Sequence, residues 1–297
     1  MKRLLLALAA AASIVAVAVA PAAAITNNYR PDSEHPYVGL VAFYDANGDF
    51  VHRCTGELLA PTVLLTAGHC TDDGTGGVNV TARVWFQQDA GAHYDVATQH
   101  DPVSGYPDEC AAGTLGTLCA ESDEMYNYGF NSFAGFPNTH DTGVVILTQP
   151  ITGLGFASLA GAGTLNVLDR AKGTQDKTFR VSGYGISEAA SKSGKPAVSF
   201  RVRLQADEQL VNTVAPYNAG YNIQLNGNGS SRGGTCSGDS GGPVYWPATS
   251  DRIVAVTSFG KSATCVGDGY YYRTDRQAVI DWVLEVSGDA GEGIVIN

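Results

Sequence analysis

Short apolar runs, separated by turn residues, recur along most of this chain of 297 residues. Glycine alone contributes 36 residues, and Asn, Asp and Pro fill many of the gaps between the runs. Val, Ile, Thr, Tyr and Phe favour pleated, half-buried strands, whereas Gly and Pro interrupt long helices. The pattern predicts an all-β protein, either a barrel or a sandwich. The candidate strands are Tyr37–Tyr44, Arg53–Leu59, Val63–Thr66, Val80–Phe86, Thr142–Leu147, Thr178–Gly183, Phe200–Leu210, Gly242–Tyr245, Ile253–Phe259 and Tyr270–Arg273.

One helix is predicted near the C-terminus. Thr274 and Gln277 have the spacing of a capping box, in which two side chains satisfy free N–H groups at a helix start. Apolar residues then follow at spacings of three and four, which place them on one helical face: Val279, Trp282, Val283 and Val286. We expect this helix to end near Gly288 and the residues after it to be frayed.

The N-terminus has the pattern of a secretory signal. Lys2 and Arg3 precede the uncharged apolar run Leu4–Ala20, and three alanines at 22–24 offer a cleavage site. An uncleaved membrane anchor is the alternative. The run of 17 residues is a little long for a signal core and a little short for a span of about 20 residues, so the alanine cleavage pattern decides in favour of a signal. The sequence therefore predicts an extracellular protein that is free of the membrane after residues 1–24 are removed.

The net charge argues against nucleic acid as a partner. The formal charge is −11, and it falls to −13 once Lys2 and Arg3 are removed. Binding to phosphates requires clustered Lys and Arg, which this chain lacks. We expect no nucleic-acid partner and no binding to anionic lipid.

Six cysteines, an even number, point to three disulfides in an exported chain, with 15 possible pairings: Cys54, Cys70, Cys110, Cys119, Cys236 and Cys265. A metal site is the alternative, but no C-x-x-C pair or Cys/His cluster has ligand spacing. Residues 99–139 are rich in Gly, Asn, Tyr and acidic residues, and we interpret them as a long surface insertion. A Cys110–Cys119 disulfide would staple this loop.

Three segments carry residues suited to nucleophilic catalysis. The first is Cys236–Pro243, which reads CSGDSGGP and contains Ser240 between glycines. A serine hydroxyl needs a base to take its proton and donors aimed at the oxyanion that forms, and glycines allow N–H groups to turn toward a substrate carbonyl. The second segment is a strand that leads to His69, the side chain best suited to proton transfer near neutral pH.

The third segment places a carboxylate, Asp141, at the start of an apolar strand. Such an acid can fix the tautomer of a histidine and stabilise its cation. Asp95 is a rival, but it lies only 26 residues after His69, and no buried strand continues from it. Asp141 is followed by Val144–Leu147 and then by Pro150-Ile151, which favours it as the partner of His69.

Together these segments resemble the chymotrypsin/trypsin-fold serine proteases. The motifs Thr-Ala-Gly-His-Cys and Gly-Asp-Ser-Gly-Gly-Pro are highly specific, and His69, Asp141 and Ser240 follow the family's chain order. The resemblance covers the start of the expected mature chain and most of residues 36–86 and 141–286, and it leaves out 99–139. It implies that Ser240 is the nucleophile, His69 the base and Asp141 its orienting acid, with an oxyanion hole made by the N–H groups of Gly238 and Ser240.

The resemblance also implies disulfide pairings and substrate contacts. Cys54–Cys70 would lie beside the catalytic histidine, and Cys236–Cys265 would brace the specificity pocket. The segment Ser258-Phe259-Gly260 resembles the one that pairs with substrate backbone, with Ser258 near the catalytic aspartate, although Phe259 replaces a commoner tryptophan.

Specificity is expected to follow from the pocket floor. Gly234 stands where trypsin-like enzymes place an aspartate, Thr235 follows it, and Gly260 and Gly269 align with the walls. Without a carboxylate, a basic substrate side chain would lose its water and gain no partner. We expect a preference for large apolar or aromatic residues before the scissile bond. A shift of one residue in the alignment would instead put Asp268 in the pocket and restore basic specificity.

The family's activation mechanism also has counterparts in this chain. In family members a new N-terminal aliphatic residue inserts, and its ammonium pairs with the aspartate before the nucleophile. Here these residues would be Ile25, exposed by cleavage after Ala24, and Asp239. We therefore expect signal cleavage itself to generate the active N-terminus.

The resemblance implies two perpendicular six-stranded antiparallel β-barrels with the active cleft between them and a C-terminal helix outside. The expected divisions are a signal peptide at 1–24, a first barrel at 25–155 and a second barrel with the helix at 156–297. We expect a monomeric serine endopeptidase that acts on protein or peptide substrates without a cofactor or metal. Asp72 and Asp73, in the loop after His69, could bind calcium, but their spacing is not diagnostic.

Two other function classes remain as alternatives. One is a catalytically silent homologue that binds a partner through the old cleft or through residues 99–139. Its intact set of catalytic residues argues against this. The other is a lipase or esterase, but the glycine-flanked serine is followed by a predicted strand, whereas the lipase elbow leads into a helix.

Overall fold

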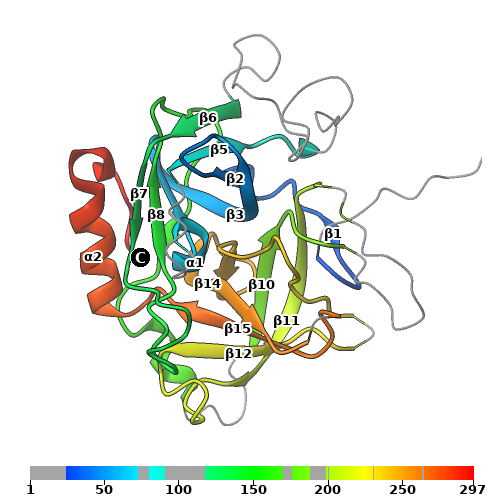
Figure 1. The fold of residues 1–297 in the computed structure, drawn as a ribbon. Coiled ribbons are helices and arrows are strands. Elements are labelled where there is room, and N and C mark those ends of the chain that lie inside the picture. The colour runs from blue at the N-terminus through cyan, green and yellow to red at the C-terminus, as the bar shows by residue number, and fades with distance from the viewer. Residues whose placement is uncertain are drawn as a thin grey trace, which may run out of the picture.

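Two β-sheets, each closed into a barrel, form the body of the protein in the computed structural model (Figure 1). The structure describes residues 25–72, 80–90, 118–169, 176–187, 199, 201–229, 231–262 and 264–297. The expected signal peptide, Cys110 and the rival Asp95 lie outside these residues. Among the helices of the described chain, none has the length and apolar character to cross a membrane.

The first barrel is built from antiparallel strands, and neighbouring strands are hydrogen-bonded in the order β6-β5-β2-β3-β4-β8-β7. Their bounds are β2 Val38–Tyr44, β3 Phe50–Ala60, β4 Val63–Thr66, β5 Thr81–Trp85, β6 Cys119–Ser122, β7 Glu124–Asn127 and β8 Gly143–Ile146. One continuous segment, 119–127, pairs with β5 through its first half and with β8 through its second half. Because it joins the two edges, it closes the sheet, so that β6 and β7 together act as a sixth strand.

The closing segment corrects one expectation. Residues 119–127 lie within the stretch that the sequence assigned to a loop-like insertion, yet they form two strands of the barrel. The reason is compositional, since Cys-Ala-Glu-Ser and Glu-Met-Tyr-Asn contain no β-branched residue. Pairing with the edges of β5 and β8 stabilises these strands. A window of four residues in the sequence does not indicate such long-range pairing.

The second barrel has the order β11-β10-β13-β14-β15-β12, and an additional β11–β12 pairing closes the ring. The strands are β10 Thr178–Gly183, β11 Leu204–Asn212, β12 Asn222–Asn226, β13 Pro243–Tyr245, β14 Arg252–Gly260 and β15 Asp268–Arg273. Two short strands, β1 Arg30–Pro31 and β9 Ser158–Leu159, add to β11 and β14. The prediction of two six-stranded barrels is confirmed, and β12 is a strand that the sequence analysis missed.

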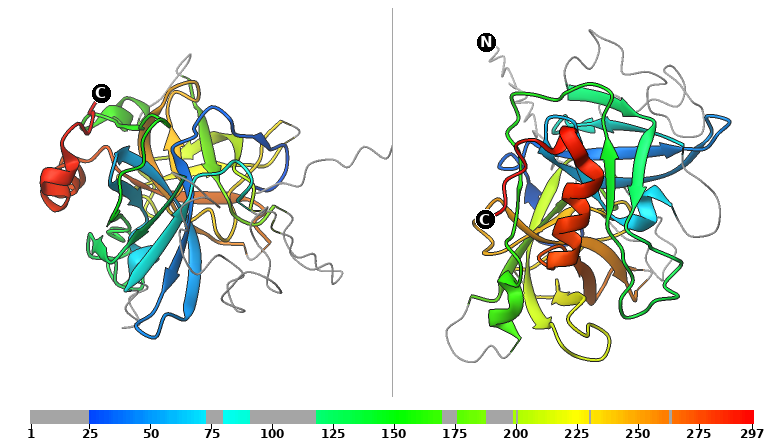
Figure 2. Two further views of the ribbon diagram at one scale, coloured as in Figure 1. Left: turned by 90° about the horizontal axis from the view of Figure 1, so that it is seen from above. Right: turned by 90° about the vertical axis from the view of Figure 1, so that its left-hand side faces the viewer.

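The C-terminal helix α2, Gln277–Ser287, follows the second barrel but packs against the first. Val279 and Val283 are buried in the core of the first barrel, and the Trp282 ring lies 5.0 Å from that of Tyr128. Figure 2 shows the red helix alongside the green strands of that barrel. The helix therefore links the two halves of the molecule, because the chain leaves the second barrel and packs against the first.

Two details of this helix differ from the prediction. Its N-cap is Arg276, without a side-chain cap, and Gln277 bonds to Asp281 one turn later, so the capping box does not form. The tail is not frayed either. A 3-10 turn, Gly288–Gly291, follows the helix, and Asn297 pairs with the backbone of Leu159. These backbone contacts come from a distant part of the chain, which local helix signals do not report.

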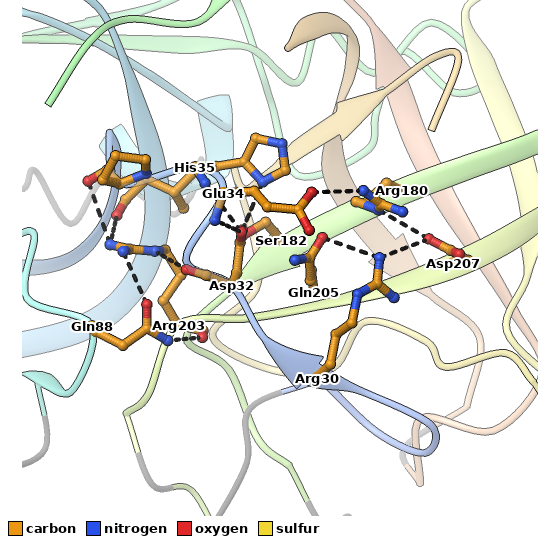
Figure 3. Close-up of polar contacts among 12 residues, drawn as sticks. Arg30, Asp32, Glu34, His35, Gln88, Arg180, Ser182, Arg203, Gln205 and Asp207 are labelled. Carbon is orange, nitrogen blue, oxygen red and sulfur yellow. Dashed lines mark hydrogen bonds and ion pairs between the residues drawn. The ribbon is translucent and has the colours of Figure 1, made fainter. Parts of the chain in front are cut away.

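The segment that follows Ile25 is held against the second barrel by a polar network (Figure 3). At its centre, the buried carboxylate of Asp32 lies 2.9 Å from Nδ1 of His35 and accepts a hydrogen bond from the Ser182 hydroxyl. Arg203 donates to the Asp32 backbone carbonyl at 2.9 Å. Burial opposes ionisation, but these hydrogen bonds and charges outweigh it and lower the pKa of Asp32.

Candidate active site

His69 follows β4 on the short helix α1, Gly68–Thr71, at one edge of the first barrel. A disulfide between Cys54 on β3 and Cys70 anchors this turn, with an S–S distance of 2.01 Å. Gly68 fits because a Cβ at that position would lie only 2.9 Å from the Cβ of Phe130. The strand, the disulfide and the packing together hold the imidazole at the surface of the barrel.

Asp141 lies just before β8, the strand next to β4 in the same barrel. Its side chain is fully buried, and one carboxylate oxygen accepts the backbone N–H of His69 at 2.8 Å. The other oxygen lies 2.9 Å from Nδ1 of His69 and also accepts the hydroxyl of Ser258 from the second barrel. The structure thus brings together His69, Asp141 and Ser258, as the sequence analysis expected.

The contact shifts the pKa values of both groups. Burial alone would lower the pKa of His69, but the charge and hydrogen bond of Asp141 outweigh it and raise the pKa above its usual 6.5. Burial would raise the pKa of Asp141, but His69 and Ser258 hold it below its usual value. The acid therefore stays ionised while the imidazole takes up a proton.

Ser240 lies in a tight turn that precedes β13, and it lines one cavity together with His69. We call this cavity the catalytic cleft; its volume is about 450 Å³ and its lining is His52, Arg53, Cys54, His69, Phe130, Ser132, Phe133, Ser240 and Ser258. Between the described residues Ser240 and His69, no side-chain hydrogen bond is formed. Such bonds often tighten only when substrate binds.

The turn that carries Ser240 needs glycine on both sides. Gly238 and Gly241 have φ values of +95° and +78°, and a Cβ at Gly241 would lie 2.1 Å from the Thr66 hydroxyl. The N–H of Asp239 donates to Cys236 and that of Gly241 to Thr257. Within the described chain, the N–H groups of Gly238 and Ser240 have no acceptor, so both remain available for an oxyanion.

A second cavity of about 450 Å³ adjoins Ser240, and we call it the primary pocket. Its lining includes every expected substrate-binding residue: Gly234, Thr235, Ser258, Phe259, Gly260 and Gly269. Gly260 pairs with Gly269 across β14 and β15, and a Cβ at Gly260 would meet nothing within 4 Å. The Cys236–Cys265 disulfide joins two segments of the lining.

Asp268 also lines the primary pocket, but its carboxylate is engaged by neighbouring amides. Gln224 and Asn226 on β12 donate to its two oxygens at 2.6 and 2.5 Å. The strand register sets Gly269 opposite Gly260, and the lining contains both residues between which the sequence alignments differ, Asp268 and Gly269.

The residues expected to act in activation are both buried. Ile25 packs in the core of the second barrel, and Thr26 pairs with Gly234 at the pocket floor. Asp239 accepts the N–H groups of Gly185 and Cys236 at 2.7 and 2.9 Å, and burial raises its pKa to about 7. An ion pair with Ile25 requires a free amino group, which residue 25 lacks while residue 24 precedes it.

Aromatic residues of the first barrel extend the site and were missed from sequence. The Phe130 ring lies 5.7 Å from that of His69 and 5.0 Å from Phe133, and Phe133 in turn lies 5.2 Å from Phe259. Phe130 and Phe133 both line the catalytic cleft. They belong to the stretch interpreted as an insertion, and their signal was an apolar, aromatic run next to Asp141.

Metal binding has little support at this site. Of the residues described, the sole group with metal-ligating atoms close together is Cys54, His69 and Cys70. Its two cysteines are joined in a disulfide and offer no thiolate.

Comparison with known proteins identifies the family. The family model described as Trypsin matches residues 25–283. The chain belongs to the trypsin family. Brachyurin of Leptuca pugilator is 29% identical over 81% of this chain and 90% of its own length. Fibrinolytic enzyme isozyme C of Lumbricus rubellus is 27% identical over 80% and 89%.

Solved structures agree with the trypsin-family assignment at the level of the fold. A structure described as HL collagenase has a TM-score of 0.59 at 16% identity and covers 86% of this chain and 94% of its own. Several other relatives are serine proteases by name, among them CLIP domain-containing serine protease B10 of Anopheles gambiae, 26% identical over 88% of this chain and 68% of its own length. The protein is thus a homologue of trypsin-family serine endopeptidases with the chymotrypsin-like fold.

Proposed function

We propose that this protein is a secreted serine endopeptidase that cleaves peptide bonds through an acyl-enzyme, with a preference for large apolar or aromatic residues before the scissile bond. The observation that carries the proposal is the double contact of Asp141 with His69 in a cavity that Ser240 also lines. The geometry leaves Nε2 of His69 as the proton acceptor, because Nδ1–H donates to the carboxylate.

In the proposed mechanism, Ser240 Oγ attacks the peptide carbonyl while His69 takes its proton. The N–H groups of Gly238 and Ser240 stabilise the oxyanion of the tetrahedral intermediate. His69 then protonates the leaving amine. In the second step, His69 takes a proton from a water molecule, which attacks the acyl-enzyme, and His69 returns the proton to Ser240. Asp141 remains ionised and stabilises the imidazolium.

The preference for large side chains rests on the shape of the primary pocket. Gly260 and Gly269 add no side chains to its walls, and Gly234 adds none to its floor. Burying an aromatic or leucine side chain in such a slot contributes about 2–3 kcal/mol.

The test is hydrolysis of peptides that differ only in the residue before the scissile bond: Phe, Leu, Ala, Arg or Glu. The enzyme is the protein beginning at Ile25, compared with Ser240→Ala and with Ser250→Ala, a serine that lines neither cavity. We expect Ser240→Ala to lose about 10⁶ in kcat and Ser250→Ala to retain activity. A folded protein that cleaves none of the peptides would instead be a silent homologue.

A further inference from the structure

A second carboxylate, Glu208, lies behind the primary pocket. Glu208 is on β11, its side chain is 1% exposed, and its Oε1 accepts the hydroxyl of Tyr271 at 2.6 Å. Its Oε2 has no hydrogen-bond partner among the described residues. Buried carboxylate oxygens are nearly always paired, so this unpaired oxygen requires an explanation.

Its position relative to the pocket is given by three contacts. A Cβ at Gly234, on the floor, would lie 3.9 Å from Oε1 of Glu208. The Tyr271 hydroxyl that binds Glu208 also lies 3.0 Å from the hydroxyl of Thr235, which lines the pocket. A Cβ at Gly269, on the wall, would lie 2.4 Å from the same Tyr271 hydroxyl. Glu208 does not itself line the pocket; its carboxylate lies behind the floor, next to the position that a side chain at residue 234 would occupy.

The charged groups that act on Glu208 are all of its own sign. They are Asp239, from the turn before β13, and Asp268, on β15; Tyr271 and the Thr235 N–H supply its hydrogen bonds. No lysine or arginine of the described chain forms an ion pair with it. Burial, more than these charges, raises the pKa of Glu208 to about 8. At neutral pH the carboxyl is therefore largely protonated, and a cation placed beside it would favour its ionised form.

We propose that Glu208 is a specificity-determining residue of the primary pocket, which lets the pocket accept lysine or arginine side chains in addition to apolar ones. The inference rests on the proposed endopeptidase function and deepens it. A long basic side chain carries its charge to the far end of the slot, past Gly234. There it pairs with the Glu208 carboxylate, directly or through a water molecule.

The proton balance makes this specificity dependent on pH. Where Glu208 is protonated, a cation must displace its proton to solvent, and binding is weakened. Where Glu208 is ionised, the cation gains its partner at no such cost. Apolar substrate side chains have no charge to pair with Glu208. Their binding is either independent of the ionisation of Glu208 or stronger when Glu208 is neutral. The preference for Arg over Phe should therefore increase as the pH rises through about 8.

The experiment compares kcat/KM for two peptides that differ only in Arg or Phe before the scissile bond. Their ratio cancels the chemistry of Ser240 and His69, which both substrates share. In the wild type, we expect the Arg:Phe ratio to rise at least about tenfold between pH 6 and pH 9. In Glu208→Gln, which keeps the shape and removes the charge, the ratio should fall at least tenfold at pH 9 and become flat, with Phe cleavage changed less than threefold.

Asp268→Asn is the matched comparison, because Asp268 is the other acid at this pocket and is already bonded to two amides. We expect it to change the ratio less than Glu208→Gln does. The proposal is overturned if Glu208→Gln leaves the ratio unchanged, if it lowers both activities equally, or if the wild type cleaves Phe but not Arg peptides at any pH.

A second measurement uses only the wild type and needs no catalysis. Benzamidine, an aromatic amidinium cation, is titrated calorimetrically into the protein at pH 6 and pH 9. We expect its dissociation constant to fall at least tenfold at the higher pH, and a constant value would overturn the proposal. This keeps the two proposals distinct: absence of all peptide cleavage refutes the endopeptidase function, whereas benzamidine binding reports on the charge at the primary pocket without any catalysis.

Discussion

The carboxylate of Asp141 holds both the backbone and the ring of His69, at 2.8 Å from the backbone nitrogen and 2.9 Å from Nδ1. Two contacts from one buried acid fix the ring's orientation as well as its tautomer. Ser258, from the other barrel, donates a hydroxyl to the same carboxylate. The pair of residues is therefore positioned by both halves of the molecule.

Replacing the acid tests this relationship directly. Asp141→Asn removes the charge and offers an N–H where His69 needs an acceptor, so the unproductive tautomer is favoured. We expect kcat to fall about 10⁴-fold at neutral pH, the size of effect described for the triad of this family. Peptide hydrolysis measures it, with the exposed Asp123→Asn as control. A loss smaller than tenfold would show that Asp141 does not orient the base.

The pH profile should report the raised pKa of His69. A protonated imidazole cannot accept the Ser240 proton, so kcat/KM is low in acid and rises as His69 deprotonates. Because the pKa of His69 lies above 6.5, the midpoint of this acidic limb should also lie above 6.5. In Asp141→Asn, the remaining activity should have a lower midpoint. A wild-type midpoint at or below 6.5 would contradict the electrostatic coupling.

The activation proposal is tested by the position of the N-terminus. A protein that begins at Ile25 has a free ammonium to offer Asp239, whereas one that begins at Ala24 leaves this buried carboxylate without that ion pair, with a pKa of about 7. Breaking a buried ion pair costs about 3–5 kcal/mol. We therefore expect at least about 100-fold lower kcat/KM for the Ala24 form. Ile25→Val at the same N-terminus is the control, and equal activity of the two lengths would refute the ion pair.

The network around Asp32 should contribute stability that acid removes. The pKa of Asp32 is lower in the folded state, so the unfolded chain binds more protons in acid. The contribution is present above the ordinary aspartate pKa of 3.8 and is lost as the pH falls through the lower folded value.

We expect Asp32→Asn to reduce the free energy of unfolding at pH 7 by about 3 kcal/mol, with a smaller difference from the wild type at pH 3. Urea denaturation measures both values. Asp45→Asn is a matched control, because Asp45 accepts two backbone N–H groups in an exposed turn and its loss should cost less. Equal effects at the two positions would count against the network.

Local patterns in the sequence were sufficient for several parts of the molecule. Strands β4 and β10 were predicted with their observed bounds, because their apolar and β-branched residues are concentrated in short runs. The motifs around His69 and Ser240 located the catalytic segments, since the glycines in them are required by the backbone of the turn itself. In each of these cases, the residues that carry the signal lie within a few positions of one another along the chain.

Only the tertiary structure decided the features that depend on distant segments. Residues 119–127 become strands because β5 and β8 present open edges. Helix α2 begins at Gln277 with Arg276 as its N-cap, so the expected capping box does not form. In the sequence, nothing distinguishes Glu208 from other acidic residues. Its environment is formed by β15 and Gly234, which lie far from it along the chain. The sequence by itself determined the fold class and the residues of the proposed triad, because local propensity and motif spacing encode them. Which charges lie at the pocket was decided by packing, because burial and electrostatic contact join residues far apart in the chain.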